Sequence, residues 1–326
     1  MKISIIIPCY NEGVVILDTY KRLSSILRFD SEIQNYEYSM IFVDDGSKDN
    51  TIDIIKDFWQ KDKCVKYISF TRNFGKEAAI LAGLSYADGD AVVMIDADLQ
   101  HPPELICEMI KYYIEGYDQV IAKRSRKGDP KIKSFFSSLY YKLVNKIVDV
   151  ELTDGVGDFR LLSRSAVNAM LSLTEYNRFS KGLFSWIGFD AKTIEYENQL
   201  RVAGKSKWSL KSLIHYGIDG VLSFNNKPLR VTIYLGFVLV LISIIYILWT
   251  FISILKNGVQ LPGYFTSITS TLVLGGVQLI SIGIIGEYIG RIYYEVKRRP
   301  HYIIKQTNIA DSNKTDGNIR RGSNEE

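Results

Sequence analysis

Two long apolar stretches near the C-terminus constrain the fold more than any other feature. Val231–Leu255 holds 25 residues without a charged side chain, and a second stretch runs from about Tyr264 to Ile289 with Glu287 as its one charge. A helix rises about 1.5 Å per residue, so either stretch can cross a hydrocarbon core about 30 Å thick. The sequence therefore predicts a two-helix transmembrane hairpin over residues 231–290. A hairpin buried inside a soluble protein is the less favoured alternative.

The charges that flank the hairpin predict its orientation. Basic residues lie outside both apolar stretches, whereas the connecting turn carries only Lys256. Positive charge is enriched on the cytoplasmic side of membrane helices. We therefore expect a multi-pass protein of the inner (plasma) membrane, with the N-terminal domain and both termini in the cytoplasm. The flanking residues are Lys227, Arg230, Arg291, Lys297, Arg298 and Arg299.

The first 122 residues alternate short apolar runs with amphipathic segments. This alternation predicts an α/β domain with a doubly wound, mostly parallel sheet. Ligands bind such sheets at the carboxyl ends of the strands, where the polar clusters 8–12, 44–47 and 96–100 are expected to lie. The predicted strands are 2–7, 38–43, 65–70, 91–95 and 119–122, and the predicted helices are 13–27, 51–59, 76–87 and 104–115.

Four regions follow from these patterns. Residues 1–208 are expected to form the cytoplasmic domain, 209–230 a juxtamembrane amphipathic segment, 231–290 the hairpin and 291–326 a basic tail. The polar end of that tail, Thr307–Glu326, predicts disorder. Two further amphipathic helices are expected. We expect the helix at 131–148 to pack on the domain, and the helix at 210–222 to lie in the membrane interface.

Asp96-Ala97-Asp98 is the strongest local indication of chemistry. The two carboxylates follow an apolar strand with one residue between them, so both can face one side of the loop. Hard oxygen ligands suit Mg²⁺ or Mn²⁺, which can then bridge phosphate oxygens. Alone, the pattern is also typical of a solvated turn. Its position at a strand end, before Leu99-Gln100-His101-Pro102-Pro103, favours the metal site.

Several motifs together resemble glycosyltransferase family 2. The closest subgroup is the polyprenyl-phosphate glycosyltransferases, which includes dolichol-phosphate mannose synthases and bactoprenol glucosyltransferases. The resemblance extends from residue 1 to about 300 and implies a GT-A fold. The motifs are Pro8-Cys9-Tyr10-Asn11-Glu12, Val43-Asp44-Asp45-Gly46-Ser47, Arg72-Asn73-Phe74-Gly75-Lys76, Asp96 to Pro103, Asp158-Phe159-Arg160-Leu161 and Arg201-x-x-Gly204-Lys205-Ser206-Lys207-Trp208.

The resemblance implies that the first three polar clusters bind the donor. Asp44 and Asp45 would accept hydrogen bonds from the base or ribose, and Asp96 would lie beside the ribose and the metal. Asp98, with Gln100 nearby, would coordinate Mg²⁺ or Mn²⁺. Pro8, Tyr10 and Glu12 would shape the nucleoside pocket. For Asp44-Asp45-Gly46-Ser47 the alternative is a turn that caps the next helix.

Acceptor chemistry is expected further along the chain. The resemblance implies Asp158 as the catalytic base or as the carboxylate that positions the acceptor. Arg160 would hold phosphate beside it, although a structural salt bridge to Asp158 or Asp154 is an open alternative for this residue. Arg124 and Arg126 are expected, with Arg160, to contact the lipid phosphate.

A second basic group is expected to bind the nucleotide sugar. Arg201, Lys205 and Lys207 would stabilise the departing diphosphate, where negative charge develops. The alternative is a solvated basic loop near an acidic membrane surface.

Together these features predict inverting transfer of a sugar from a nucleotide sugar, with UDP-glucose favoured, to undecaprenyl phosphate or a related polyprenyl phosphate. The same reaction with UDP-N-acetylglucosamine or GDP-mannose stays open. A catalytically inactive membrane scaffold is disfavoured by the intact Asp96-Ala97-Asp98. A processive polysaccharide synthase is disfavoured by the absence of a Gln-x-x-Arg-Trp motif. Gly286-x-x-x-Gly290 permits self-association, and no nucleic-acid partner is expected.

Overall fold

An eight-stranded mixed sheet forms the centre of the N-terminal domain in the computed structural model. The structure describes residues 1–29, 36–125, 145, 155–197 and 263–310, with scattered positions between 234 and 256. The strand order is β7-β5-β6-β4-β1-β2-β3-β8. Strands β6 and β8 run opposite to the others. The strands are β1 Lys2–Cys9, β2 Glu37–Asp44, β3 Val65–Phe70, β4 Ala91–Met94, β5 Gln119–Arg124, β6 Val156–Ser163, β7 Ala191–Tyr196 and β8 Ile304–Thr307.

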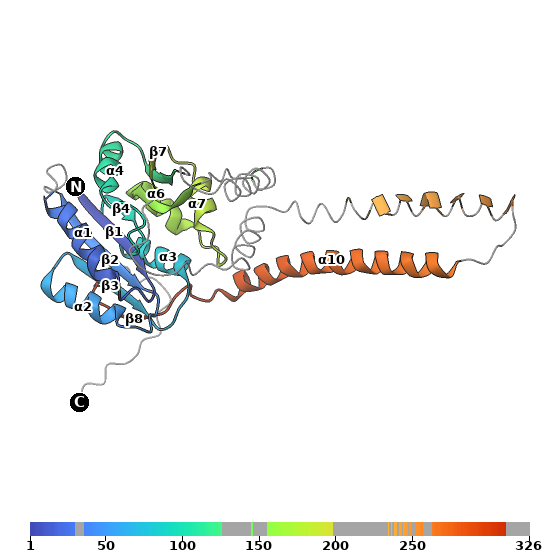
Figure 1. Ribbon diagram of the computed structural model, residues 1–326, viewed down its shortest axis with the longest axis horizontal. Coiled ribbons are helices and arrows are strands. Elements are labelled where there is room, and N and C mark those ends of the chain that lie inside the picture. The colour runs from blue at the N-terminus through green and yellow to red at the C-terminus, as the bar shows by residue number, and fades with distance from the viewer. Residues whose placement is uncertain are drawn as a thin grey trace, which may run out of the picture.

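Helices cover both faces of this sheet, which confirms the predicted doubly wound α/β arrangement (Figure 1). Strand alternation sends Ile3, Ile5 and Ile7 to one face and Ile6 to the other, so each face buries its own apolar cluster. Helices α1 (Ile16–Phe29), α2 (Thr51–Lys61) and α4 (Leu105–Ile114) pack on the first face. Helices α3 (Lys76–Tyr86), α6 (Arg164–Ser172) and α7 (Ser180–Trp186) pack on the second.

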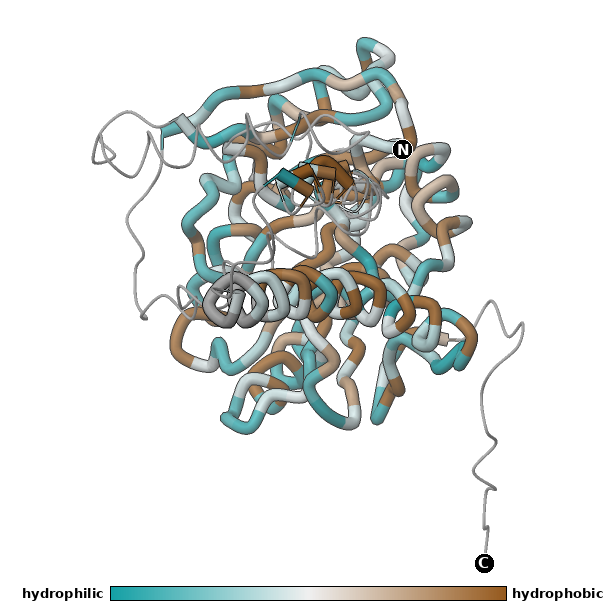
Figure 2. Tube along the Cα trace, turned by 90° about the vertical axis from the view of Figure 1, so that its right-hand side faces the viewer, coloured by the Kyte–Doolittle hydropathy of each residue, from teal (hydrophilic) through white to brown (hydrophobic). Residues whose placement is uncertain are grey.

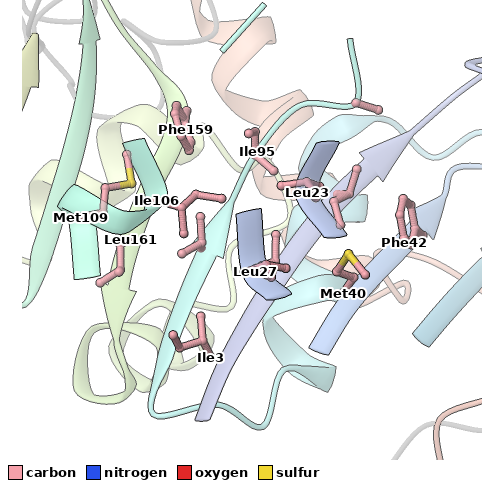
Figure 3. Packing of buried hydrophobic residues seen from close by; sticks show 14 of the residues in the cluster. Ile3, Leu23, Leu27, Met40, Phe42, Ile95, Ile106, Met109, Phe159 and Leu161 are labelled. Atoms are coloured by element: carbon pink, nitrogen blue, oxygen red, sulfur yellow. The ribbon is translucent and has the colours of Figure 1, made fainter. Parts of the chain in front are cut away.

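The first cluster shows how the layers interlock. Leu23 and Leu27 of α1 lie over Met40 and Phe42 of β2, while Ile106 and Met109 of α4 face Phe159 and Leu161 of β6 (Figure 3). All eight side chains are essentially inaccessible to solvent. Burial on this scale fixes the strand register, because a one-residue slip would turn every apolar side chain to the wrong face. The carboxyl edge of the sheet is therefore a rigid platform.

The nine elements predicted before residue 122 are all present, with boundaries that differ by at most three residues. Strands β6, β7 and β8 and helices α6 and α7 had no counterpart in the prediction. The predicted helices at 131–148 and 210–222 lie outside the described residues, apart from Asn145 in the first.

Helix α10 (Tyr264–Lys297) extends away from the domain (Figure 1) and is longer than the predicted span of 264–289. Within the described part of the chain, one helix is long and apolar enough to cross a membrane, over Val273–Lys297. Hydrophobic residues recur along this helix (Figure 2), and apolar side chains such as Leu279, Ile280 and Ile282 are exposed. A surface of this kind suits lipid rather than water. For the predicted first span, 231–255, only scattered positions are described.

The chain returns to the domain after α10, and here the predicted tail needs correction. Ile304–Thr307 forms β8, which pairs antiparallel with β3 at the edge of the sheet. Asn308 accepts a hydrogen bond from the Tyr67 backbone N–H at 2.7 Å and donates one to the Val65 carbonyl at 3.2 Å. Disorder was therefore predicted too early in the chain. Residues 311–326 lie outside the described residues.

Candidate active site

The loops that follow β1, β2 and β3 are tied to one another at the carboxyl edge of the sheet. Asn11 adopts a left-handed backbone conformation, and its N–H donates to the Ser47 hydroxyl at 2.9 Å while its side-chain oxygen accepts from the Lys48 N–H at 2.8 Å. Gly46 has φ +66°, and a Cβ there would lie 2.4 Å from the Arg72 carbonyl carbon. Only glycine permits this approach. Two of the predicted donor-binding clusters, 8–12 and 44–47, are therefore held side by side, next to the loop that follows β3.

Asp44 and Asp45 are both buried and both hold this surface together. Asp44 accepts hydrogen bonds from the Ser47 N–H at 3.0 Å and the Ser69 hydroxyl at 2.7 Å. Asp45 accepts from the N–H groups of Phe74 and Gly75 at 2.7 and 3.0 Å. Burial raises the pKa of Asp45, and these two N–H groups offset the rise in part. Contacts of Asp44 and Asp45 with the base or ribose stay a prediction. The roles of the half-buried Pro8, Tyr10 and Glu12 also stay predictions.

Asp96 and Asp158 face each other because β6 runs antiparallel to β4. Ala91 pairs with Ser163 and Met94 with Arg160, and the same register carried two residues further sets Asp96 opposite Asp158. In an antiparallel pair the start of one strand lies at the end of its neighbour. The start of β6 therefore lies at the carboxyl edge, where ligands bind. Two predicted site residues far apart in sequence are brought together in this way.

Lys76 joins the two carboxylates. Its ammonium nitrogen lies 2.7 Å from Asp96 Oδ1 and 2.6 Å from Asp158 Oδ2. Burial opposes ionisation of all three groups, but the pairing outweighs it: the pKa of Lys76 is raised, and the pKa values of Asp96 and Asp158 are lowered. Both aspartates are therefore anionic near neutral pH. The Asp158 side chain is 18% exposed, so it is reachable at the surface of the site.

The predicted metal-ligating segment makes a tight turn directly after β4. Leu99 is buried with φ 56°, and Asp98 Oδ1 accepts a hydrogen bond from the Gln100 N–H at 3.2 Å. The side chains of Asp96, Asp98 and Gln100 are each partly exposed. These carboxylate and amide oxygens are the donor types that Mg²⁺ and Mn²⁺ prefer. Among the described residues, no three His, Cys, Asp or Glu side chains cluster closely enough to form a complete metal cage. A cation here would therefore draw further ligands from phosphate oxygens and water.

His101 extends this network to the other half of the sheet. Its Nδ1 lies 2.5 Å from the Tyr196 hydroxyl, and its Nε2 lies 3.5 Å from Asp96 Oδ2. Burial raises the pKa of Tyr196 to about 12, so this hydroxyl keeps its proton at neutral pH. When it donates to Nδ1, the imidazole presents its Nε2 proton to Asp96. The ring of Phe159 packs against His101 with centroids 5.4 Å apart.

The two described arginines of the predicted lipid-phosphate site differ in exposure. Arg124 ends β5 at the same edge and is partly exposed, and its N–H donates to the Gly155 carbonyl at 2.9 Å. Arg160 is 2% exposed, donates to the Gly157 carbonyl at 2.8 Å and stacks 3.9 Å over the Phe184 ring. These contacts face the domain interior, so they favour a structural role for Arg160. Its contacts with a substrate stay a prediction. Arg126, Arg201, Lys205 and Lys207 lie outside the described residues.

Sequence reasoning assigned no role to Lys76, His101 or Tyr196. Lys76 and His101 stand in two of the motifs that carry the family resemblance. Lys76 also begins a helix directly after a strand-end loop, and ligands often bind at such helix starts. Tyr196 had no local signal, because its proximity to His101 depends on β7 pairing beside β5.

Comparison with known proteins identifies the family. Residues 4–171 match the glycosyl transferase family 2 model, and residues 227–292 match the GtrB C-terminal hairpin model. The chain is 60% identical over 307 residues to the putative glycosyltransferase CsbB of Bacillus subtilis, covering 94% of this chain and 92% of that one.

Two further relatives bear a more specific name. The SfII prophage-derived bactoprenol glucosyl transferase of Shigella flexneri is 46% identical over 308 residues, covering 94% of this chain and 98% of its own. The prophage bactoprenol glucosyl transferase homolog of Escherichia coli K12 is 42% identical, covering 94% of this chain and 99% of its own. Together with the GT-A-type sheet and the apolar helix α10, these matches show that the chain belongs to glycosyltransferase family 2, with the membrane-associated GtrB hairpin at its C-terminus.

Proposed function

We propose that this protein transfers glucose from UDP-glucose to undecaprenyl phosphate with inversion at the anomeric carbon. The observation that carries the proposal is the placement of Asp158 opposite Asp96 at the carboxyl edge of the sheet. Asp96 belongs to the segment predicted to bind the donor and the metal, and Asp158 belongs to the segment predicted to bind the acceptor. Relatives named bactoprenol glucosyl transferases, similar over nearly the full chain, support the choice of sugar and acceptor.

The acceptor needs little chemical activation. A phosphate monoester has a second pKa of about 6, so its oxygen is already largely ionised at neutral pH. The lowered pKa of Asp158 makes it a weak base, and burial together with the pairing to Lys76 fixes its position. Its task is therefore to orient the acceptor and to take a residual proton rather than to create the nucleophile.

The donor needs a stabilised leaving group. Asp96, Asp98 and Gln100 offer oxygen ligands that fit Mg²⁺ or Mn²⁺, with Asp98 as the principal ligand. Such a cation neutralises charge on the departing diphosphate. His101, which Tyr196 contacts, lies beside Oδ2 of Asp96, whereas Lys76 contacts Oδ1. Arg201, Lys205 and Lys207 are proposed to add positive charge to the diphosphate, and Arg124 and Arg126 to the lipid phosphate.

The lipid acceptor explains the membrane hairpin. The proposed arrangement has two spans, 231–255 and 264–289, in the inner membrane, with the catalytic domain and both termini on the cytoplasmic side. The basic residues beyond Ile289 support this orientation. The polyprenyl phosphate then reaches the site from the membrane surface, while the soluble nucleotide sugar enters from the cytoplasm.

The test is a donor screen with the full-length protein in detergent. Undecaprenyl phosphate is incubated with radiolabelled UDP-glucose, UDP-N-acetylglucosamine or GDP-mannose, each with Mg²⁺, Mn²⁺ or excess chelator, and the lipid product is extracted. We expect a metal-dependent glucolipid that Asp98→Ala abolishes without loss of folding. A product from another donor would correct the sugar assignment. No glycolipid from any donor would overturn the proposed function.

A further inference from the structure

The ammonium group of Lys76 occupies the centre of the site. It lies within 2.7 Å of Asp96 and 2.6 Å of Asp158, and it comes from a third element, the first turn of α3. Gly75, with φ 97°, precedes the helix and turns the chain so that Lys76 begins it beside the two carboxylates. This arrangement joins the donor segment after β4 to the acceptor segment at the start of β6.

Two carboxylates held face to face repel each other unless a cation lies between them. The sheet fixes their backbone, because β4 and β6 are paired up to the residues just before them. Neither carboxylate can therefore move far away to relieve the repulsion. Lys76 supplies the positive charge that makes this close placement stable in the chain itself.

A divalent cation at Asp96 and Asp98 would bind the same carboxylate of Asp96 that Lys76 now neutralises. We propose that Lys76 is a positioning residue: it is a built-in counter-cation that holds Asp158 and Asp96 in place before the donor binds and competes with the divalent cation for Asp96. The inference rests on the proposed function for the identity of the donor metal. It adds that the site discriminates against metal without nucleotide.

The competition has a consequence that can be measured without turnover. With Lys76 in place, Asp96 is already neutralised, so Mn²⁺ alone binds weakly. The diphosphate of the nucleotide adds phosphate ligands and negative charge, which tip the balance toward the metal. Without Lys76, Asp96 and Asp158 lose the cation that they share, and the two carboxylates attract Mn²⁺ more strongly even when no nucleotide is present.

The experiment follows the electron paramagnetic resonance signal of free Mn²⁺ during titration of the full-length protein in detergent. We expect Lys76→Met to tighten the binding of Mn²⁺ alone by ~10-fold, since one charge within 3 Å of a ligand is lost. We expect Lys76→Arg to bind like the wild type, because it keeps the charge. Lys66→Met removes a lysine that pairs with Asp88 at the opposite edge, and it should also bind like the wild type.

The titration separates the two proposals. Unchanged or weaker Mn²⁺ binding by a folded Lys76→Met, or equally tight binding by Lys76→Arg and Lys76→Met, would overturn the role of Lys76. Thermal unfolding establishes that each variant is folded, and Lys76→Gln provides a second neutral variant if Lys76→Met is not. Because no sugar is transferred, a failed donor screen with tighter Mn²⁺ binding in Lys76→Met would overturn the proposed function and leave this inference standing.

Discussion

At the scale of single residues, the site combines groups whose charges are fixed by their neighbours. Asp158 is buried enough for its pKa to rise, yet Lys76 at 2.6 Å lowers it below its usual range. Tyr196 keeps its proton and orients His101 toward Asp96. Asp158 is therefore ionised and Tyr196 protonated before substrate arrives, so that binding needs little electrostatic rearrangement at these two groups.

Asp158→Asn tests whether this carboxylate acts on the acceptor. The amide keeps the size of the side chain but loses the charge that pairs with Lys76 and the ability to take a residual proton from the acceptor. We expect turnover to fall by ~10²–10⁴-fold, the range for a lost acid–base or orienting group. Calorimetry should find UDP affinity in the presence of Mn²⁺ changed by less than about threefold, a shift well below the tenfold that corresponds to 1.4 kcal/mol. Asp88→Asn, at the opposite edge, is the matched control and should retain full turnover. Turnover above half of the wild-type value in Asp158→Asn would contradict the assignment.

How much of the site was predictable also depends on single residues. Asp96 and Asp98 follow an apolar strand, and strand ends in a parallel sheet are where ligands bind, so local pattern sufficed for them. Asp158 was identified through its motif, but nothing local predicts that it lies opposite Asp96. That fact depends on the antiparallel register of β6 with β4. Lys76 was missed for the same reason, since both of its partners are distant in sequence.

At the scale of elements, the carboxylate of Asp88 ties several segments together at the amino edge of the sheet. Asp88, in the turn between α3 and β4, accepts from the ammonium groups of Lys2 at 2.6 Å and Lys66 at 3.1 Å. These lysines start β1 and β3, so one side chain links three segments. The ion pairs of Asp88 are half exposed, and they lie at the edge of the sheet opposite to the predicted substrate positions.

Asp88→Asn should therefore affect stability but not activity. Burial would raise the pKa of Asp88, but the two lysines lower it, so ionised Asp88 stabilises the fold. A lowered pKa contributes stability above the unfolded value, about 3.9, and that contribution disappears as pH falls through the folded value. Since the side chain is 47% exposed, we expect a loss of at most about 1 kcal/mol at pH 7. The difference in thermal unfolding between wild type and variant should be largest at pH 7 and should shrink as the pH falls below about 4. A difference that stays equal as the pH falls would contradict the ion-pair explanation.

Some strands and helices could be predicted from their own sequence, and others could not. Strands β1–β5 and helices α1–α4 were predicted because each carries its own apolar run or apolar face. Strand β8 was not, because Ile304–Thr307 follows a basic segment and has no alternation of its own. Its place depends on the exposed edge of β3, on Asn308 bonding to that strand and on Tyr302 stacking on Phe70 at 5.0 Å. Tertiary pairing of this kind outweighs local propensity.

At the scale of the whole molecule, α10 is longer than a membrane is thick and reaches the N-terminal domain. Its 34 residues span about 51 Å, whereas a hydrocarbon core is about 30 Å thick. In the proposed arrangement, with the span at 264–289, the last turns lie outside the hydrocarbon. They dock on the loop between α6 and α7. Tyr176 stacks on Tyr294 with centroids 5.5 Å apart and on His301 at 5.6 Å, and its N–H donates to Glu295 at 2.7 Å.

This junction is close to the site. The same loop leads into α7, where Ser180 donates hydrogen bonds to Glu77, the neighbour of Lys76 on α3. Strand β8 fastens the chain to the domain a second time after α10. The domain is thus held to the C-terminal end of α10 through two attachments, the Tyr176 contacts and β8. In the proposed arrangement, these attachments would set the position of the active-site edge above the membrane.

Tyr176→Ala tests whether this docking serves the lipid acceptor. The change removes both ring stacks but keeps the backbone hydrogen bond to Glu295. Two aromatic pairs contribute about 0.5–1.5 kcal/mol each, or about 1–3 kcal/mol together, so we expect KM for undecaprenyl phosphate to rise by between about 5-fold and about 150-fold. KM for the nucleotide sugar should not change, because that substrate comes from solution.

A short, water-soluble isoprenyl phosphate should be used equally well by wild type and variant, since it needs no fixed membrane position. Tyr113→Ala, on α4 away from the junction, should match the wild type with both acceptors. Equal KM rises for long and short acceptors in Tyr176→Ala would show that the junction shapes the site itself rather than its position above the membrane.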